Sequence, residues 1–356
     1  MRNILILGGT GAMGKHIVDL LNAAGDSVFV TSRTTHNNYG NITYLKGNAK
    51  DEVFVEKILH LQEWDVIVDF MIYQTDEFQN RYEKLLSSCK QYVFLSSSRV
   101  YADTQPSIIE SSPRLLDICD DLEYLATEEY ALSKAREENL LIHSPYSNWT
   151  IIRPYITYSE NRLQLGVLEK EYWLYQAVHK RTIVFSKDIA EKTTTLTYGY
   201  DVAQGINSII GRKEAFGKVF HITVDESHTW QEIFDVYLRV LTDFLGCIPK
   251  VKMIDKNPRM NIPSSKWQVV YDRYYNRRFD NTAINQFVDT TTFRPTLEGV
   301  ENCLRSFLKN PTFYNVGWGE HAMYDRITGE WTPFKEIPTW KQRIVYLLRR
   351  TILPKR

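Results

Sequence analysis

Hydrophobic and polar positions follow two alternating patterns over roughly the first 155 residues of the chain. Residues 4–7 are all apolar, whereas residues 15–24 place Ile17, Leu20 and Leu21 at helical spacing. The two patterns then repeat and predict strands at 28–30, 42–45, 66–68, 92–95 and 150–152, and helices at 53–61, 82–88 and 123–141. Strands that alternate with helices form a parallel sheet covered on both faces. We therefore expect an α/β fold with a doubly wound parallel sheet.

The pattern becomes less regular beyond Pro154. A helical stretch that opens at Asp201 and an apolar run at 219–222 predict that the chain returns to the first sheet. A chain of 356 residues usually divides, because single cores stop growing near ~250–300 residues. The predicted boundaries are 1–155, with a return at 197–225, for the sheet domain, 156–196 and 226–309 for a substrate lobe, and 310–356 for a C-terminal extension.

Charge and cysteine content argue against several classes of function. Lys and Arg number 43 and Asp and Glu 43, so no net field attracts a polyanion, and generic nucleic-acid binding is disfavoured. The 4 cysteines are widely spaced and include no Cys-x-x-Cys pair, which predicts neither a disulfide framework nor a metal site. The apolar run after Met1 is too short for a signal peptide, and no run approaches the ~18 residues of a membrane span. These features predict a soluble, cytoplasmic protein.

A glycine-rich turn lies between the first predicted strand and the first predicted helix. It reads Gly8-Gly9-Thr10-Gly11-Ala12-Met13-Gly14. Such a turn lets the backbone approach a pyrophosphate, and the N-terminus of the following helix favours the negative charge. Its position at the start of a strand–helix–strand pattern predicts a dinucleotide site formed by Gly8, Thr10, Gly11, Ala12, Met13 and Gly14.

The end of the second predicted strand indicates which dinucleotide binds. An acid ~20 residues after the glycines accepts from the ribose 2′-OH of NAD, whereas an Arg accommodates the 2′-phosphate of NADP. Here the strand ends Thr31-Ser32-Arg33, which slightly favours NADP over NAD. The alternative is that Arg33 is a solvated loop cation. Asn48, after the third strand, either hydrogen-bonds the adenine or caps the helix that follows.

Three polar residues suited to proton transfer are predicted to meet at the carboxyl edge of the sheet. Tyr130 and Lys134 lie four residues apart in a predicted helix and share a face, while Ser97 follows the strand at 92–95. A phenol has a free pKa near ~10 and acts as a base near neutrality only when a neighbouring cation stabilises its phenolate. Ser97 would hydrogen-bond the substrate oxygen during hydride transfer to or from the cofactor. The alternative is a half-buried Tyr130 and a surface Lys134 without a catalytic role.

With these motifs the chain resembles the extended short-chain dehydrogenase/reductase family, in its branch of nucleotide-sugar epimerases and dehydratases. The resemblance covers roughly residues 1–225 and is carried by the loop at 8–14, Leu95-Ser96-Ser97-Ser98-Arg99-Val100-Tyr101, the Tyr130/Lys134 pair, Ile152-Arg153-Pro154-Tyr155 and Asp201-Val202-Ala203. It implies a Rossmann domain, a smaller C-terminal substrate lobe and a catalytic trio of Ser97, Tyr130 and Lys134. It also implies cofactor contacts from Phe70, Met71, Lys134, Pro154 and Tyr155, and substrate contacts from Ser98, Arg99 and Arg153.

Departures from the family pattern narrow the expected reaction. Family dehydratases place an Asp-Glu pair directly after the catalytic Ser or Thr, where this chain has Ser98-Arg99, so dehydration is disfavoured. Phe70 and Met71 replace small residues, which predicts a bulkier nicotinamide pocket. The leading hypothesis is an NAD(P)-dependent nucleotide-sugar epimerase of polysaccharide biosynthesis that acts through a transient ketone. The alternatives are an NADPH-dependent keto-sugar reductase, an enzyme of a smaller keto or hydroxy substrate, and a non-catalytic NADP-sensing or RNA-associated protein.

Two further patterns concern partners. The resemblance implies a homodimer packed through helices near 78–88 and 123–141, although Leu125, Leu132 and Leu140 would equally face the sheet. Residues 340–356 contain 6 basic residues and no acid. Their apolar residues would line one helical face, opposite Arg343 and Arg350, and comprise Ile344, Leu347, Leu348 and Ile352. This segment fits either a helix docked on its own lobe or a subunit partner, or a helix lying on an anionic membrane surface.

Overall fold

The computed structural model describes residues 1–352 and divides the chain into two compact units. The first unit comprises the segments Met1–Thr157, Thr195–Ser227 and Arg277–Thr296. The second unit comprises Tyr158–Thr194, His228–Asn276 and residues 297–352. The chain therefore crosses between the units several times, and each unit collects segments that are distant in the sequence.

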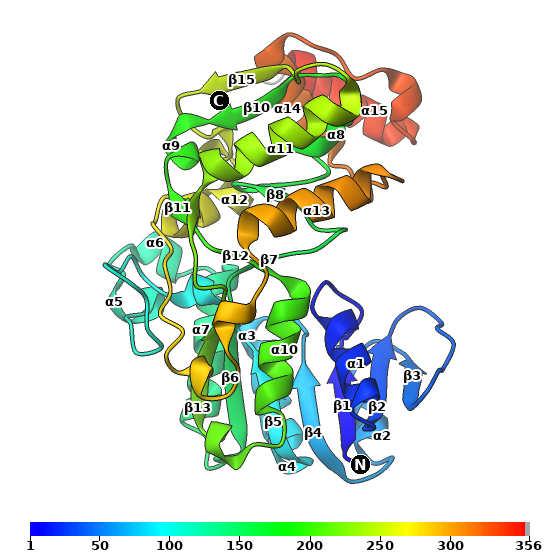
Figure 1. Ribbon diagram of the computed structural model, residues 1–356, viewed down its shortest axis with the longest axis vertical. Helices are drawn as coiled ribbons and strands as arrows, with labels where there is room; N and C mark the ends of the chain where they lie inside the picture. Colours follow the sequence, from blue (N-terminus) through cyan, green and yellow to red (C-terminus); the bar gives the residue numbers. More distant parts are fainter. Residues whose placement is uncertain (353–356) are drawn as a thin grey trace. The chain divides into compact units, whose positions relative to one another are not determined.

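The first unit is built around a 7-stranded sheet (Figure 1). Its strands are β1 (Asn3–Leu7), β2 (Ser27–Ser32), β3 (Ile42–Lys46), β4 (Trp64–Asp69), β5 (Cys89–Leu95), β6 (Trp149–Pro154) and β13 (Lys218–Ile222). Across the sheet they lie in the order β13-β6-β5-β4-β1-β2-β3, and every neighbouring pair is parallel. The winding reverses between β1 and β4, the point at which open α/β sheets bind ligands. The doubly wound Rossmann fold expected from the sequence is confirmed.

Strand β1 illustrates why this sheet is buried on both faces. All four residues of its apolar run, Ile4, Leu5, Ile6 and Leu7, are fully buried. Successive side chains of a strand point to opposite faces, so Ile4 and Ile6 join one hydrophobic core while Leu5 and Leu7 join another. A central parallel strand with a core on each side therefore requires a continuous apolar run.

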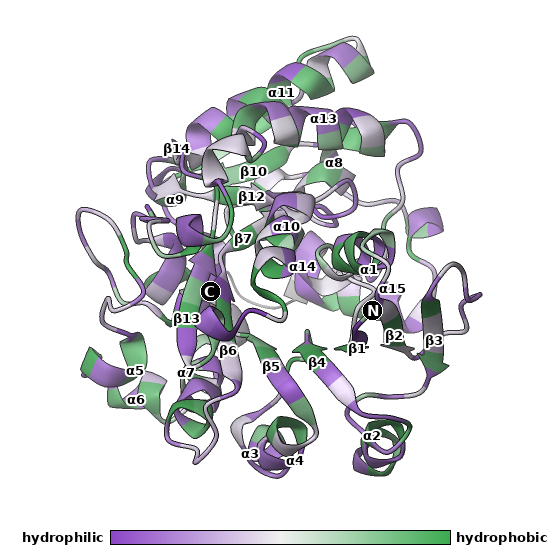
Figure 2. Cartoon of the chain, turned by 60° about the horizontal axis from the view of Figure 1, so that its bottom comes forward, coloured by the Kyte–Doolittle hydropathy of each residue, from purple (hydrophilic) through white to green (hydrophobic). Residues whose placement is uncertain are grey.

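Helices cover both faces of the sheet (Figure 1). The face that carries Ile4 and Ile6 packs against α1 (Gly14–Ala23) and α10 (Gly199–Ile209). The opposite face packs against α2 (Glu52–Leu59), α4 (Tyr82–Ser87) and the end of α7 (Tyr130–Ile142). Hydrophobic and hydrophilic residues alternate around helices such as α2 and α4 in Figure 2, as expected for helices with one face on a core.

Shorter elements complete the first unit and its borders. They are α3 (Thr75–Gln79), η1 (Ser98–Val100), α5 (Leu115–Ile118), α6 (Leu122–Leu125), β7 (Ile156–Tyr158), β12 (Leu196–Tyr198), η2 (Lys213–Ala215), η5 (Ile284–Gln286) and η6 (Thr290–Thr292). Of these, η1 follows β5 directly and packs against α7. This contact brings two of the predicted catalytic segments together.

The second unit consists of short strands and helices around its own core. Its elements are β8 (Gln164–Leu165), β9 (Leu168–Glu169), α8 (Trp173–Val178), β10 (Ile183–Ser186), α9 (Lys187–Ala190), β11 (Thr193–Thr194), β14 (His228–Thr229), α11 (Trp230–Leu245), β15 (Val251–Ile254), η3 (Pro258–Asn261), α12 (Pro263–Gln268), η4 (Val269–Arg273), α13 (Thr296–Leu308), α14 (Trp318–Thr328), η7 (Phe334–Glu336), α15 (Trp340–Leu347) and η8 (Leu348–Ile352). Strands of two to four residues carry too few positions to show a clear period, which explains the weak pattern in the sequence.

The structure differs from the sequence-based boundaries in three places. Residues 277–296, expected in the substrate lobe, belong to the first unit because Ile284 and Phe293 are buried in the same core as Ile4. The segment expected as a separate C-terminal extension belongs to the second unit. The helix predicted at 123–141 is two helices, α6 and α7, and Glu129 caps the second by accepting from the backbone N–H of Ala131.

Candidate active site

The loops after β1 and β4 meet at the point where the winding of the sheet reverses. Gly8 has a left-handed φ of 76°, and its N–H donates to Thr31 Oγ1 at 2.9 Å. The N–H of Phe70 donates to the carbonyl of Leu7 at 2.9 Å. A Cβ at Gly8 would lie 2.8 Å from Met71 Sδ, so only glycine fits between the loops. The side chains of Phe70 and Met71 are partly buried against the two cores.

The glycine loop then leads into α1 with the geometry of a phosphate cradle. A Cβ at Gly14 would lie 2.6 Å from the backbone of Gly9, so the first turn of the helix packs directly on the loop. Gly11, by contrast, is exposed and its missing Cβ points into open space. No side chain caps the helix at Met13, and its first turn contains no acid. These residues, with exposed Thr10 and half-buried Ala12, fit the diphosphate of a dinucleotide.

A hydroxyl-rich cluster surrounds the position expected to contact the ribose. His36 Nε2 lies 3.0 Å from both Ser32 Oγ and Thr34 Oγ1, and its ring stacks on Tyr44. Arg33 is exposed between these residues. Asn48 is also exposed, and its Oδ1 accepts from the backbone of Lys50. One interpretation of the sequence expected Asn48 to cap α2, but Asn48 does not cap this helix.

Asp51 caps that helix instead. Its carboxylate accepts from the backbone N–H of Phe54 at 3.0 Å. Asn48 is exposed just after β3. Its predicted hydrogen bond to the adenine stays a prediction.

The three serines after β5 have different environments. Ser97 is buried, precedes η1 and accepts from the backbone N–H of Arg99 at 3.2 Å through its Oγ. Ser98 is fully buried and donates to the carbonyl of Arg153 at 2.7 Å. Ser96 donates to Glu138 Oε1 at 2.5 Å. The Ser98 hydroxyl thus joins the ends of β5 and β6, and its predicted contact with substrate stays a prediction.

Tyr130 is the first residue of α7 and is half-buried. The guanidinium of Arg99 lies over its ring, with Cζ 5.3 Å from the ring centroid. Arg99 also forms an ion pair with Glu129 at 2.5 Å. Ser97 caps η1, which carries Arg99, and η1 packs against α7. The predicted meeting of Ser97 with Tyr130 stays a prediction. Arg99, which the sequence predicted to contact substrate, is a cation that contacts the Tyr130 ring.

Lys134 lies one helical turn further along α7 and is almost fully buried. Its Nζ donates to Glu137 Oε2 at 2.9 Å and to the carbonyl of Met71 at 3.3 Å, and lies 4.4 Å from the centroid of the Phe94 ring. The reading of Lys134 as a surface cation is therefore wrong. Its ammonium contacts the loop after β4, beside the glycine loop, but its charge is balanced by Glu137.

Glu137 is fully buried and was not identified from the sequence. Its Oε1 meets no hydrogen-bond donor within the part of the chain that the structure describes. Burial raises the pKa of Glu137 to about 7, against the opposing effect of Lys134, and the nearby Asp69 and Glu128 add to the rise. The i to i+3 spacing of Lys134 and Glu137 was the available sequence signal for this pair.

Asp69, at the end of β4, adds a second buried carboxylate near Lys134. It accepts from Tyr73 and Tyr92 hydroxyls at 3.0 and 2.8 Å and from the backbone N–H of Met71 at 2.9 Å. Complete burial raises the pKa of Asp69 above its ordinary value, although these donors and Lys134 oppose the rise. The loop after β4 is thus held in place by a buried polar network.

Arg153, predicted to contact substrate, is instead part of a buried ion pair. Its Nε and Nη2 donate to Glu138 at 2.8 and 2.6 Å, and its Nη1 donates to the carbonyl of Glu110 at 3.0 Å. The guanidinium also lies over the ring of Tyr101, 4.7 Å from its centroid. These contacts hold the buried guanidinium inside the protein, and the expected contact of Arg153 with substrate stays a prediction. Pro154 ends β6, and Tyr155 follows the strand and packs its ring on that of Phe279.

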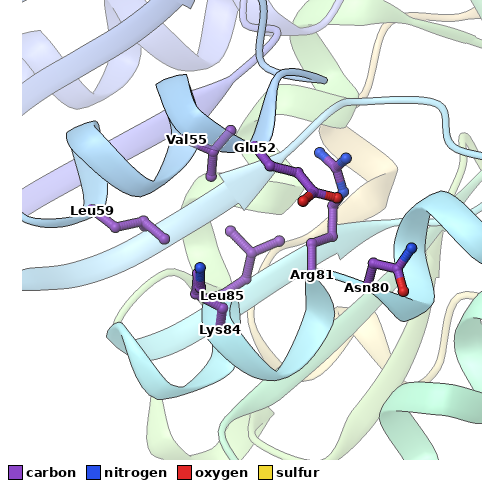
Figure 3. A pocket seen from close by; sticks show the side chains of 7 residues that line it. All are labelled: Glu52, Val55, Leu59, Asn80, Arg81, Lys84 and Leu85. Carbon is purple, nitrogen blue, oxygen red and sulfur yellow. The ribbon is translucent and has the colours of Figure 1, made fainter.

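A surface hollow between α2 and α4 lies apart from these residues (Figure 3). It is lined by Glu52, Val55, Leu59, Asn80, Arg81, Lys84 and Leu85. The Arg81 guanidinium donates to the carbonyls of Ala49 and Lys50. Because its lining includes none of the predicted site residues, the hollow is not a candidate active site.

Among residues 1–352, no group of three or more His, Cys, Asp or Glu side chains could hold a metal ion. No helix in the same range is both long and apolar enough to cross a membrane.

The sequence profile of the NAD dependent epimerase/dehydratase family matches residues 4–222 of this chain. A curated relative, the chloroplast stem-loop binding protein of 41 kDa b from Arabidopsis thaliana, is 23% identical over 274 residues. That alignment covers 72% of this chain and 67% of the relative.

Several solved structures share the fold at low sequence identity. The enzyme WbmH of Bordetella bronchiseptica, in complex with NAD⁺, aligns with a TM-score of 0.67 and 15% identity, covering 88% of this chain and 100% of that one. The dTDP-glucose 4,6-dehydratase of Bacillus anthracis, with NAD, gives 0.65 at 15% identity, covering 87% and 97%. The UDP-glucuronic acid 4-epimerase of Bacillus cereus, with UDP-glucuronic acid and NAD, gives 0.64 at 15%, covering 87% and 100%. These likenesses show the fold.

Proposed function

Because the chain belongs to the NAD dependent epimerase/dehydratase family, we propose that it is an NAD(P)-dependent epimerase of a nucleotide-linked sugar. The observation that carries this proposal is the position of Tyr130. It lies at the start of α7, with the Arg99 guanidinium over its ring, and α7 packs against η1, which Ser97 caps. Solved structures of the same fold hold NAD, and two of them also hold UDP-glucuronic acid.

In the proposed reaction Tyr130 takes the proton of a sugar hydroxyl and later returns it to the same oxygen. The Arg99 guanidinium lies over the Tyr130 ring and positions it, and Ser97 hydrogen-bonds the substrate oxygen while the proton moves. The nicotinamide, when bound, supplies reversible hydride transfer at the carbinol carbon. Return of hydride to the opposite face of the sugar ketone inverts that carbon with no net redox change.

Dehydration is not proposed, because the residues after Ser97 supply no acid for loss of water. Ser98 donates to the Arg153 carbonyl, and Arg99 is paired with Glu129. Lys134 is proposed to fix the loop after β4 through Met71, which is its observed contact there.

The test is conversion of nucleotide sugars, including UDP-glucuronic acid, with NAD⁺ and no added reductant. Product formation is followed by NMR spectroscopy. Tyr130→Phe is expected to lower kcat/KM at least ~100-fold, because a positioned acid–base group contributes that much or more. Tyr82→Phe, at a half-buried tyrosine on α4 whose hydroxyl donates to Glu83, is the matched control. Activity that survives Tyr130→Phe unchanged would overturn the assignment.

An NADPH-dependent keto-sugar reductase is a second candidate, favoured by the cluster around Arg33. Arg33 is exposed beside Ser32, Thr34 and His36, which together offer a cation and several hydrogen-bonding groups to a 2′-phosphate. Arg33→Ala is expected to raise the Kd for NADPH by ~10–100-fold while leaving the Kd for NADH almost unchanged. Isothermal titration calorimetry measures both constants, with Lys57→Ala on α2 as the control. Tighter binding of NADH than NADPH by the wild type would remove this candidate.

A third candidate, RNA association, is favoured by the name of the Arabidopsis relative, which is a stem-loop binding protein. The equal numbers of acidic and basic residues argue against strong electrostatic attraction. An RNA stem-loop in an electrophoretic mobility-shift assay tests it directly. Binding that persists in Tyr130→Phe, in a protein that converts no nucleotide sugar, would place this candidate first.

A further inference from the structure

The helix α15 and the turn η8 present an apolar face to solvent. Its exposed residues are Trp340, Ile344, Val345 and Leu348, with exposed fractions of 66%, 45%, 46% and 43%. Trp340, Ile344 and Leu348 form one row at i, i+4 and i+8, and Val345 lies in the adjacent row between Lys341 and Arg349. We refer to these four apolar residues as the α15 outer face.

The opposite side of the same helix docks on the second unit through polar groups. The ring of Tyr346 is fully buried, and its hydroxyl donates to Asp325 at 2.6 Å and accepts from the backbone N–H of Thr332 at 2.8 Å. Arg343 and Arg350 donate to the carbonyls of Ile337 and Glu330. A helix that only covers a core turns its apolar side inward, whereas this one leaves much of its apolar side outward. The prediction of a helix docked on its own lobe therefore describes one side of α15 and leaves its exposed apolar side unexplained.

The charged residues of the segment that carries the α15 outer face are all positive. Residues 340–352 contain Lys341, Arg343, Arg349 and Arg350 and no acid. On neighbouring elements, Glu336 is paired with Arg181 and Glu320 with Arg259, while the buried Asp325 accepts from Gln176, Thr332 and Tyr346. The sequence predicted a basic helix through residue 356, but its last two basic residues, Lys355 and Arg356, lie outside the described residues.

We propose that the α15 outer face is a docking surface for an anionic phospholipid membrane. An apolar stripe with tryptophan at one end and cations alongside fits the boundary between headgroups and acyl chains, where the cations meet lipid phosphates. A second copy of this chain fits less well. A two-fold contact through the same face would bring Lys341 and Arg349 of both copies together without any acid from this segment to offset them.

Vesicle co-sedimentation tests the proposal with the full chain. Vesicles made of equal parts phosphatidylglycerol and phosphatidylcholine are compared with vesicles of phosphatidylcholine alone. The wild type is expected to bind only the anionic vesicles, and less tightly as salt is added. Lys341→Glu with Arg349→Glu is expected to weaken binding at least ~30-fold, since each cation near an anionic surface contributes ~5-fold. Trp340→Ser with Ile344→Ser is expected to abolish binding.

The controls separate this face from general effects of the substitutions. All four positions are exposed, so the variants keep the Tyr346 contacts and are expected to fold, which circular dichroism melting verifies. Leu122→Ser and Lys218→Glu, at exposed positions of the first unit, are matched controls that should bind as the wild type does.

Three outcomes would overturn the proposal. The first is a wild type that leaves anionic vesicles unbound, and the second is binding that both double variants retain. The third is a wild-type dimer, seen by light scattering, that Trp340→Ser with Ile344→Ser converts to a monomer, because a second copy would then cover the face. The proposal stands independently of the reaction catalysed.

Discussion

Glu137 and Glu138 are neighbours on α7 and both are fully buried, yet their surroundings differ sharply. Glu138 accepts two hydrogen bonds from Arg153, one from Arg114 and one from Ser96. Glu137 accepts from Lys134 through one oxygen, while its second oxygen lacks a donor among residues 1–352. Consecutive helical residues point ~100° apart, so adjacent carboxylates reach different environments.

This difference separates a carboxylate that holds the fold from one that can exchange a proton. Glu138 balances two guanidinium groups and connects α7 to the ends of β5 and β6. Glu137 lies beside Lys134 with a pKa raised to about 7 by burial, so it changes charge near neutrality. A buried group of that kind next to a candidate catalytic residue often marks a functional site. The two positions therefore predict different responses to substitution and to pH.

The largest expected effect is the loss of stability in Glu138→Gln. The substitution leaves the buried Arg153 without its counter-charge, which typically costs about 3–5 kcal/mol of the free energy of unfolding. Urea denaturation measures that free energy. Glu56→Gln, which breaks the exposed ion pair with Lys84, is the control and should cost less than ~1 kcal/mol. Similar small losses in both variants would show that Glu138 is not a structural anchor.

A smaller effect, and one that depends on pH, is expected for Glu137→Gln. The folded-state pKa of Glu137, about 7, lies above its ordinary value of 4.5, so between these pH values the folded state binds more protons than the unfolded state. The contribution of Glu137 to stability therefore falls as pH rises from 4.5 to 7 and is constant above that range. The integrated loss is about 3 kcal/mol. Asp69, whose pKa burial also raises, acts in the same direction.

Glu137→Gln removes this titration. As pH rises from 5 to 8, the free energy of unfolding of the wild type should therefore fall relative to that of the variant. Urea denaturation at a series of pH values measures the difference. Glu52→Gln, at an exposed position on α2, controls for the loss of one carboxylate. A difference that stays constant with pH would contradict the assignment of a proton to Glu137.

The same contrast shows what the sequence could predict. The apolar run of β1, the glycine loop and the Tyr130/Lys134 spacing depend on local pattern, and the parallel sheet follows from their order. The roles of Arg153 and Glu138 depend on contacts between residues 15 positions apart in different elements. No local pattern encodes such contacts. The sequence motif therefore singled out Arg153 and predicted a contact with substrate, but it could not predict the ion pair with Glu138.

Two other differences between the sequence-based predictions and the structure also arise from contacts between distant residues. Propensity favours one helix through residues 126–129, but the cap at Glu129 and its pairing with Arg99 end and restart the helix there. Residues 277–296 lack a clear period, and only the burial of Ile284 and Phe293 shows which core they join. In each case tertiary contacts override a weak local preference.

The smallest expected effect is that of Arg114→Gln, which tests how far the surroundings of Glu138 are redundant. Arg114 donates to Glu138 at 3.1 Å, but it also donates to Asp117 and Asn139, and its side chain is partly accessible. Arg153 remains to balance Glu138 after the substitution, so a loss of about 1–2 kcal/mol is expected. The double variant Arg114→Gln with Glu138→Gln should lose less than the sum of the single losses, since the two residues share one interaction. Additive losses in urea denaturation would mean that Arg114 stabilises the fold through Asp117 and Asn139 alone, and that Arg153 by itself neutralises Glu138.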